Sequence, residues 1–288
     1  MSERPLATDL ALALQYGLPH RLLSRAMYYL MRSKIGWLKN LLIGQIARRY
    51  KVDMRDALEP DLRAYASFNA FFTRPLRPNA RPLANAGLIC PADGAISQLG
   101  KIESGRILQA KGMHYDVAEL LADTALAEHF NAGSFATVYL SPRDYHRVHM
   151  PITGTLVRSL HIPGRLFSVA TWTAESIPRL FARNERYVCV YDTEQGKVAL
   201  VLVGAIFVSS IETIVDGVIT PPYAPSVVAR DYPEAPNLSA GAEMGRFNMG
   251  STVIVLTEKQ MTFDAALTAG SPVKMGQALS ADRNRDCL

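Results

Sequence analysis

The sequence has few cysteines and lacks long apolar runs. Cys90, Cys189 and Cys287 are almost a hundred residues apart, and none belongs to a C-x-x-C pair. A disulfide framework or a structural zinc site is therefore not expected, and a reducing compartment fits the pattern. The longest charge-free apolar stretch, Val198 to Ile211, has fourteen residues, whereas a membrane-spanning helix needs about 20. It predicts one or two buried strands instead.

The N-terminus also lacks the features of a secretion signal. The stretch MSERPLATDLALALQYG carries acidic residues among its apolar ones. It has no basic start, unbroken apolar core or small-residue cleavage site, so export is not expected. Hydrophobic residues make up 49% of the chain and charged residues 20%, which argues against a disordered protein and indicates a globular one with a sizeable core.

Positive charge is concentrated at the N-terminal end. Residues 1–51 hold nine Lys and Arg against two acidic residues, a balance of +7, while the other 22 basic and 24 acidic residues leave −2. From His20 to Tyr50 apolar residues recur at helical spacing without an internal proline. Such a basic amphipathic segment is typical of a helix in a membrane interface, and equally of a surface helix packed on its own domain. No nucleic-acid-binding motif accompanies it, so nucleic acid is not an expected partner.

From about Asp61 the chain changes to short strand-like runs separated by turns. AISQLG, FATVYL, RYVCVYD, VALVLV and STVIVLT are rich in β-branched and aromatic residues, while helical periodicity is confined to VAELLADTALAEHF and a few short pieces. The regular strand-helix alternation of a parallel sheet is missing. We therefore expect an α+β fold, with a mainly antiparallel β core in residues 61–288 and an amphipathic helical segment in residues 1–60.

Asp93, His149 and Ser251 together suggest nucleophilic chemistry. Asp93 lies in the turn PADG, His149 in HRVHMP, and Ser251 follows Gly250 in MGST. Taken singly, such turns are usually structural. Together they offer a carboxylate to orient an imidazole, an imidazole to accept a proton and a hydroxyl to attack. Ser251 lacks a G-x-S-x-G context, and the neighbouring carbonyl of Gly250 is an unshielded target on the same backbone.

His146 and His149 also invite comparison with a metal site. Their spacing of three places both rings on one face only if the stretch is helical. Pro142 before them and Pro151 after them favour a turn, and neither HExxH nor a nearby Cys completes a ligand set. No metal is therefore expected.

The stretches around these residues resemble the bacterial-type phosphatidylserine decarboxylases, which are pyruvoyl-dependent and process themselves. The resemblance rests on PADG, YLSPRDYHRVHMP and MGST, with FFTRPLRPNARPL before them and PGRLFSVATWTAESIPRLFARNERY between, over residues 60–280. Many members have Leu where this chain has Met249. That exchange keeps size and polarity and puts no part of the mechanism in doubt.

The resemblance implies a self-made cofactor. Ser251, with Asp93 and His149 as its charge relay, would attack the Gly250 carbonyl and cut the chain into residues 1–250 and 251–288. Ser251 would become a pyruvoyl group, which forms a Schiff base with the amine of phosphatidylserine and serves as an electron sink. His146 matches the family's residue for the decarboxylation step. The products would be phosphatidylethanolamine and CO2.

A phospholipid substrate favours membrane docking for residues 1–60, because basic side chains are attracted to an anionic leaflet. The expected location is the cytoplasmic face of the cell membrane, as a peripheral protein. The resemblance also implies that the long and short chains stay associated and that processed units form dimers, although the sequence shows no interface. Three other functions stay open on the residues alone: a pyruvoyl decarboxylase of a soluble amino acid, a Ser-His-Asp hydrolase, and a noncatalytic membrane-binding module.

Overall fold

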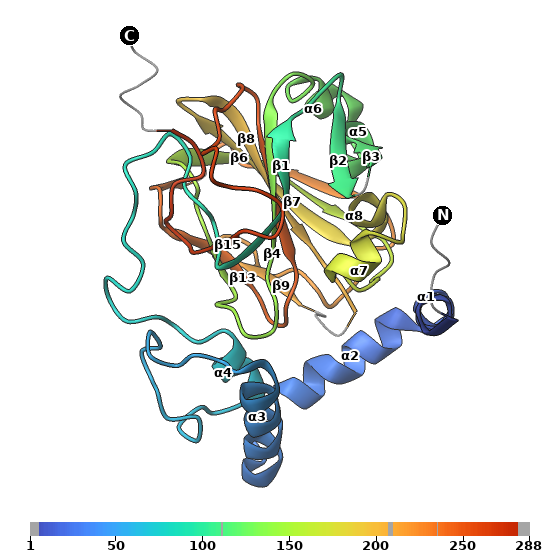
Figure 1. The fold of residues 1–288 in the computed structure, drawn as a ribbon, viewed down its shortest axis with the longest axis vertical. Helices are drawn as coiled ribbons and strands as arrows, with labels where there is room; N and C mark the ends of the chain where they lie inside the picture. The colour runs from blue at the N-terminus through green and yellow to red at the C-terminus, as the bar shows by residue number, and fades with distance from the viewer. Residues whose placement is uncertain (1–5, 111, 207–209, 235, 282–288) are drawn as a thin grey trace.

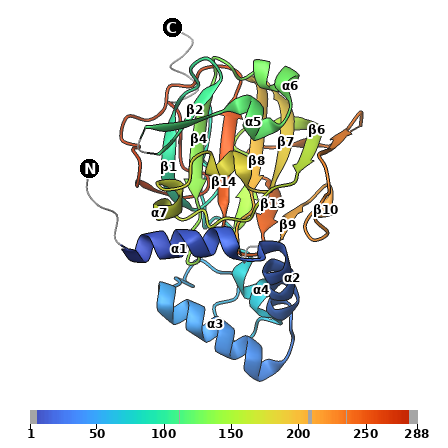
Figure 2. The ribbon, with the colours of Figure 1, turned by 90° about the vertical axis from the view of Figure 1, so that its right-hand side faces the viewer.

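The basic N-terminal segment forms three helices. The computed structural model describes residues 6–110, 112–206, 210–234 and 236–281. The three helices, α1 (Leu6–Gly17), α2 (His20–Met31) and α3 (Gly36–Tyr50), lie at one end of a β-rich core (Figures 1 and 2). The helical pattern expected from His20 to Tyr50 is thus confirmed, with a break at residues 32–35. There the Ser33 hydroxyl accepts a hydrogen bond from the N–H of Ile35 at 3.3 Å, a local turn that replaces the helical ladder.

A small aromatic core attaches α2 and α3 to the rest of the chain. It is centred on α4 (Phe68–Phe72), whose first turn is capped by the Ser67 hydroxyl accepting from the N–H of Ala70. The buried side chains of this core come from α4, from Tyr65 before it, from Met31 at the end of α2 and from Ile43 on α3. The inner faces of α2 and α3 are therefore used for packing.

One large antiparallel sheet forms most of the core. Its strand order is β11-β6-β7-β8-β14-β4-β1-β15, and β12 also pairs with β6. The strands are β1 (Gly94–Lys101), β4 (Ser134–Tyr139), β6 (Gly154–Ile162), β7 (Arg186–Thr193), β8 (Gly196–Val203), β11 (Val228–Asp231), β12 (Asn237–Leu238), β14 (Thr252–Thr257) and β15 (Pro272–Val273).

Smaller elements complete the fold. A second antiparallel sheet has the order β10-β9-β13-β5, and β2 pairs with β3 as a hairpin. These strands are β2 (Arg106–Ala110), β3 (Met113–Asp116), β5 (Arg147–His149), β9 (Ile211–Thr213), β10 (Gly217–Val218) and β13 (Glu243–Phe247). The short helices are α5 (Val117–Leu121), α6 (Thr124–Glu128), α7 (Thr171–Ala174) and α8 (Leu180–Arg183). The expected α+β class with a mainly antiparallel core is confirmed.

The centre of the large sheet is covered on both faces. All six residues of β14 are buried, and so are the last six residues of β8, which lies beside it. Continuous apolar runs are typical of strands that face no water on either side, which explains why VALVLV and TVIVLT do not alternate. The turn before β14 carries Gly250 and Ser251, so the candidate cleavage point lies at the entrance to the central strand.

Candidate active site

Ser251 is held at the entrance to the central strand β14 with its hydroxyl unpaired. The next residue, Thr252, pairs with Tyr139 on β4 and with Val203 on β8. The carbonyl of Ser251 accepts a hydrogen bond from the N–H of Leu140 at 2.8 Å. The residue is fully buried, and its Oγ has no hydrogen-bond partner. Because a buried, unpaired hydroxyl is costly to leave unsatisfied, it marks a candidate functional group.

Gly250 is closely surrounded on the other side of the same peptide bond. A Cβ atom placed on Gly250 would lie 3.1 Å from Nε2 of His146 and 3.2 Å from the carbonyl oxygen of Leu140. A larger residue at position 250 would therefore push against the imidazole. The sequence requires glycine here because of this close approach, and the contact places His146 beside the Gly250–Ser251 bond.

His146 has a free ring nitrogen beside the Gly250–Ser251 bond. Its Nδ1 lies 2.8 Å from the carbonyl oxygen of Asp144, so Nδ1 carries the proton and donates it. Its ring packs against Phe72, with centroids 4.0 Å apart. Burial, and then the positive charge of Arg74, lower the pKa of His146 to about 3. The ring is therefore neutral, and the buried Nε2 has a lone pair and no partner.

His149 has both ring nitrogens occupied. Its Nδ1 lies 2.8 Å from the carbonyl oxygen of Gly241, to which it donates, and the Tyr145 hydroxyl donates to Nε2 at 2.9 Å. Burial lowers the pKa of His149. The ring is held in a single tautomer by these two contacts, and Tyr145 covers the nitrogen that would accept a proton.

Asp93 is a buried carboxylate whose partner comes from an upstream loop. The Arg81 guanidinium donates to both oxygens of Asp93, with Nη2 to Oδ2 at 2.6 Å, and the N–H of Met275 donates at 2.9 Å. The ammonium of Lys274 lies 3.3 Å from Oδ2. Burial alone raises the pKa of Asp93, but the Arg81 and Met275 hydrogen bonds outweigh it, so the net pKa is lowered. The carboxylate is ionised.

The structure thus brings some of the sequence-derived candidates together and leaves others apart. His146, Gly250 and Ser251 meet at the start of β14, whereas Asp93 and His149 each have other partners. In the part of the chain that is described, no hydrogen bond joins Asp93 to His149 or His149 to Ser251.

Sequence analysis missed the groups that hold these residues. Arg81 is in FFTRPLRPNARPL and Tyr145 in YLSPRDYHRVHMP, two stretches that carried the resemblance. Their membership of these stretches was the available signal. The pairing of Arg81 with Asp93 and of Tyr145 with His149 depends on tertiary structure, which a short sequence motif cannot predict.

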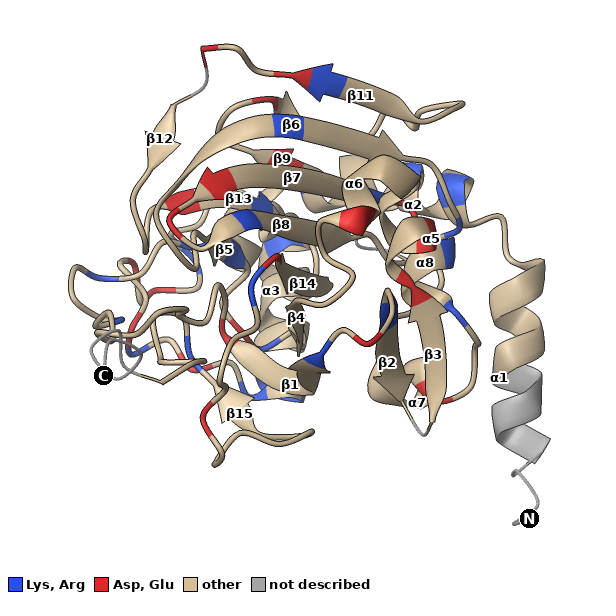
Figure 3. Cartoon of the chain, turned by 90° about the horizontal axis from the view of Figure 1, so that it is seen from above, with Lys and Arg blue, Asp and Glu red and all other residues tan. Residues whose placement is uncertain are grey.

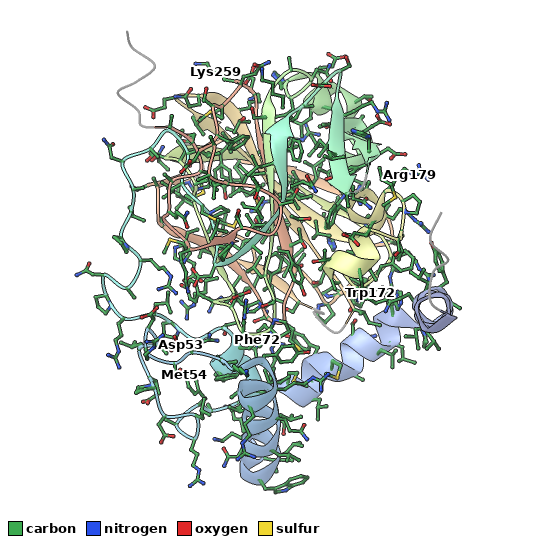
Figure 4. All side chains as sticks on the ribbon, in the orientation of Figure 1. Asp53, Met54, Phe72, Trp172, Arg179 and Lys259 are labelled. Carbon is green, nitrogen blue, oxygen red and sulfur yellow. The ribbon has the colours of Figure 1, made fainter. Side chains whose placement is uncertain are left out.

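A cavity of about 420 Å³ opens onto Gly250. The helical segment and the β core both contribute to its wall, and Figure 4 shows Phe72 at the junction between them. None of the lining residues is Lys, Arg, Asp or Glu. They are Gln15, Ile46, Tyr50, Phe72, Tyr139, Leu140, Pro142, Ser168, Val169, Ala170, Ala205, Ile206, Met249 and Gly250. The cavity is therefore mostly apolar, with a few neutral polar groups.

Two further features bear on the sequence-based expectations. Across the residues that the structure describes, no group of three or more His, Cys, Asp and Glu side chains could hold a metal ion. No helix in the same ranges is long and apolar enough to cross a membrane.

Comparison with known proteins agrees with the motifs. A family model described as phosphatidylserine decarboxylase matches residues 68–281, and one described as PSD matches residues 10–51. The chain is 57% identical over 274 residues to the phosphatidylserine decarboxylase proenzyme of Pseudomonas aeruginosa strain LESB58, covering 92% of this chain and 94% of the relative. It is 54% identical over 275 residues to the proenzyme of Pseudomonas putida strain F1, covering 93% and 96%. The chain belongs to the phosphatidylserine decarboxylase family.

Proposed function

We propose that this protein decarboxylates phosphatidylserine to phosphatidylethanolamine and CO2, using a pyruvoyl group that it makes from its own Ser251. The single observation that carries the proposal is the surroundings of the Gly250–Ser251 bond. A buried hydroxyl without a partner follows a glycine that touches a neutral imidazole, at the wall of a mostly apolar cavity. These residues fit a pyruvoyl group, which is small, uncharged and attached where Ser251 now precedes β14.

Self-cleavage starts with the hydroxyl of Ser251. Its Oγ attacks the carbonyl carbon of Gly250, the peptide C–N bond breaks, and an ester links the two residues while the nitrogen of Ser251 gains a proton. A base then removes the Cα proton of residue 251, and the Cβ–O bond breaks, which leaves Gly250 as a carboxylate. The resulting dehydroalanine takes up water and loses ammonia. The long chain thus ends at Gly250, and the short chain begins with a pyruvoyl group.

Asp93 and His149 are proposed to accept the proton of Ser251 as a charge relay. Burial lowers the pKa of His149 overall, and the negative charges of Glu243 and Asp93 partly offset this effect, which suits an imidazole that must hold a proton during the attack. Arg81 keeps Asp93 ionised at the same time. The Tyr145 hydroxyl occupies Nε2 of His149, so the relay requires that this hydrogen bond open or that Tyr145 pass the proton on.

His146 is proposed to act in the decarboxylation step. The pyruvoyl carbonyl supplies an electron-withdrawing group that makes loss of CO2 from the attached amino acid possible. Nε2 of His146 is unprotonated and lies beside Gly250. It is placed to relay a proton to the α-carbon after CO2 has left. Because its pKa is about 3 in the empty site, this role requires that the negative charges of the bound substrate raise that pKa.

The helical segment is proposed to dock the enzyme on the cytoplasmic face of the cell membrane as a peripheral protein. Leu22 on α2, and Trp37 and Leu41 on α3, are 67%, 71% and 52% exposed. The sequence of α1 has no Lys or Arg, and its described part is tan in Figure 3, so we assign the cations facing an anionic leaflet to α2, to α3 and to the turn between them. Exposed apolar and basic side chains on the same two helices favour a lipid substrate over a soluble amino acid.

Intact mass and product analysis test this proposal. The native protein should contain residues 1–250 and a 38-residue piece, 251–288, with a blocked N-terminus. The Ser251→Ala variant should stay uncut and should not make phosphatidylethanolamine. A native protein that is active as one full-length species would refute the pyruvoyl proposal. A cleaved protein that decarboxylates free serine and not phosphatidylserine would indicate a soluble amino-acid substrate.

A further inference from the structure

The end of α1 reaches into the candidate active site. Gln15 lines the cavity that opens onto Gly250, as do Ile46 and Tyr50 of α3. The helical segment therefore supplies part of the cavity wall, in addition to its exposed surface. A side chain in the cavity wall can contact the substrate headgroup directly, whereas the exposed residues of the helices would contact only the membrane surface.

The position of Gln15 is fixed by several contacts. The guanidinium of Arg165 donates to the carbonyl oxygen of Tyr16 at 2.7 Å, and the ring of Tyr16 packs on Phe167 with centroids 5.1 Å apart. His20, at the start of α2, also packs edge-on against Phe167. The last turn of α1 is thus held on residues 165–167, next to Ser168 of the cavity wall.

The amide of Gln15 has one defined orientation. The N–H of Ser168 donates to Oε1 of Gln15 at 3.0 Å. Since a backbone N–H can only donate, the amide oxygen must face Ser168, and the NH2 group is turned the other way. Within the described ranges, no acceptor is paired with Nε2 of Gln15. The side chain therefore presents two N–H donors that have no partner among the described residues.

These donors are available to an oxygen acceptor, and the proposed substrate has two anionic groups that provide one. No lining residue is a cation, so neutral donors such as this amide must satisfy the anionic headgroup inside the cavity. A donor on the carboxylate would stabilise the charge that must disappear as CO2 forms, which raises the barrier. A donor on the phosphodiester stabilises a group that is unchanged by the reaction.

Resting on the proposed function, we infer that Gln15 binds the phosphodiester of the lipid headgroup through its Nε2 amide, so that α1 takes part in substrate recognition. Gln15→Glu gives a sharp test, because a carboxylate oxygen can still accept from the N–H of Ser168 while both donors are lost. Gln15→Leu removes the donors and the Ser168 contact together. Gln45→Glu, on the exposed face of α3 and outside the cavity wall, is the matched control for charge.

The experiment measures binding of short-chain, water-soluble phosphatidylethanolamine to the cleaved protein by calorimetry. This lipid has the phosphodiester and lacks the carboxylate. We expect Gln15→Glu and Gln15→Leu to raise its Kd at least tenfold, since a hydrogen bond to a charged group is worth about 1.5–3 kcal/mol. The KM for short-chain phosphatidylserine should rise in parallel. Gln45→Glu should match the parent in both measurements, and all variants should show complete cleavage by mass.

Other outcomes would overturn the inference in distinct ways. Unchanged phosphatidylethanolamine binding with a raised KM for phosphatidylserine would assign the contact to the carboxylate. Loss of binding in Gln15→Leu with normal binding in Gln15→Glu would show that Gln15 only supports Ser168. Parent-like behaviour of both variants would remove Gln15 from recognition altogether. If the parent itself makes no phosphatidylethanolamine, it is the proposed function that fails.

Discussion

At the residue scale, chemistry in this protein depends on which partner each polar group has. The residue types and the motif order pointed to Asp93, His146, His149 and Ser251 before any geometry was known. They could not tell which histidine has a free nitrogen, because that depends on two backbone carbonyls and on Tyr145. The two histidines differ in their hydrogen-bond partners, and these partners are set by the fold.

This separation predicts different phenotypes for the two histidines. His149→Ala and Asp93→Ala should fail to cleave, because the attacking hydroxyl loses its base or the base loses its orienting charge. His146→Ala should still cleave substantially but should decarboxylate short-chain phosphatidylserine at least about 100-fold more slowly, the contribution typical of a positioned acid or base. Gel analysis of cleavage and a CO2-release assay on each variant measure the two steps. Reversed phenotypes would exchange the proposed roles.

The lowered pKa of His146 predicts a pH-dependent stability. The group's pKa is about 3 in the folded state, against an ordinary 6.5, so the unfolded chain binds the extra proton first. Its stabilising effect is present above pH 6.5 and is lost as the pH falls from 6.5 towards 3, by up to about 1.4 kcal/mol per pH unit. His146→Gln, made in the uncut Ser251→Ala chain, should flatten the unfolding free energy over this window relative to Ser251→Ala alone. Parallel pH curves for the two proteins would contradict a buried neutral His146.

At the element scale, the sequence predicted strands better than helix ends. A continuous apolar run such as TVIVLT predicts a strand that is covered on both faces, and β14 confirms this prediction. The helical periodicity of VAELLADTALAEHF predicts one helix, but the structure has two, α5 and α6. The helix breaks because Ala122 adopts a left-handed conformation and the Asp123 side chain caps the start of α6. Likewise, no pattern in residues 6–17 could predict that Gln15 lines a cavity formed by residues far along the chain.

The exposed apolar side chains of α2 and α3 allow the docking proposal to be tested by replacing them. Replacing Leu22, Trp37 and Leu41 with Ser should lower the salt-resistant binding to vesicles at least about tenfold, because each side chain loses apolar burial in the interface. Leu42 is left unchanged, since it packs on the aromatic core around α4. Val228→Ser, on the exposed edge strand β11, is the control and should bind as the parent does.

The basic residues of α2, of α3 and of the turn between them should control a different part of the binding. Replacing Arg25, Lys34 and Arg48 with Gln should chiefly remove binding that rises with anionic lipid and falls with salt, at roughly 1 kcal/mol per charge. Activity on a soluble short-chain substrate should stay near that of the parent in both sets. Unchanged vesicle binding in both sets would make α2 and α3 ordinary packed helices.

At the scale of the whole molecule, the candidate cleavage point divides the chain in front of its central strand. The first strand of the short chain, β14, lies between β4 and β8, and β15 pairs with β1. Beyond β15 the short chain continues to exchange backbone hydrogen bonds with the long one, with Cys90 donating to Gln277 at 2.7 Å and Gly276 donating to Cys90 at 2.9 Å. Its Met275 also holds Asp93. Cutting one peptide bond before residue 251 therefore removes none of these contacts.

We therefore expect the short chain to stay bound after cleavage. The four apolar side chains from Val253 to Leu256 are fully buried, which corresponds to roughly 6–12 kcal/mol of hydrophobic stabilisation. Native mass spectrometry and gel filtration should find both pieces together, and guanidinium should separate them.

After dilution from guanidinium, the cleaved protein should refold at a rate that rises with protein concentration, because two chains must meet. Uncut Ser251→Ala should refold at a concentration-independent rate. Loss of residues 251–288 during native gel filtration would mean that β14 is not the strand that holds the processed enzyme together.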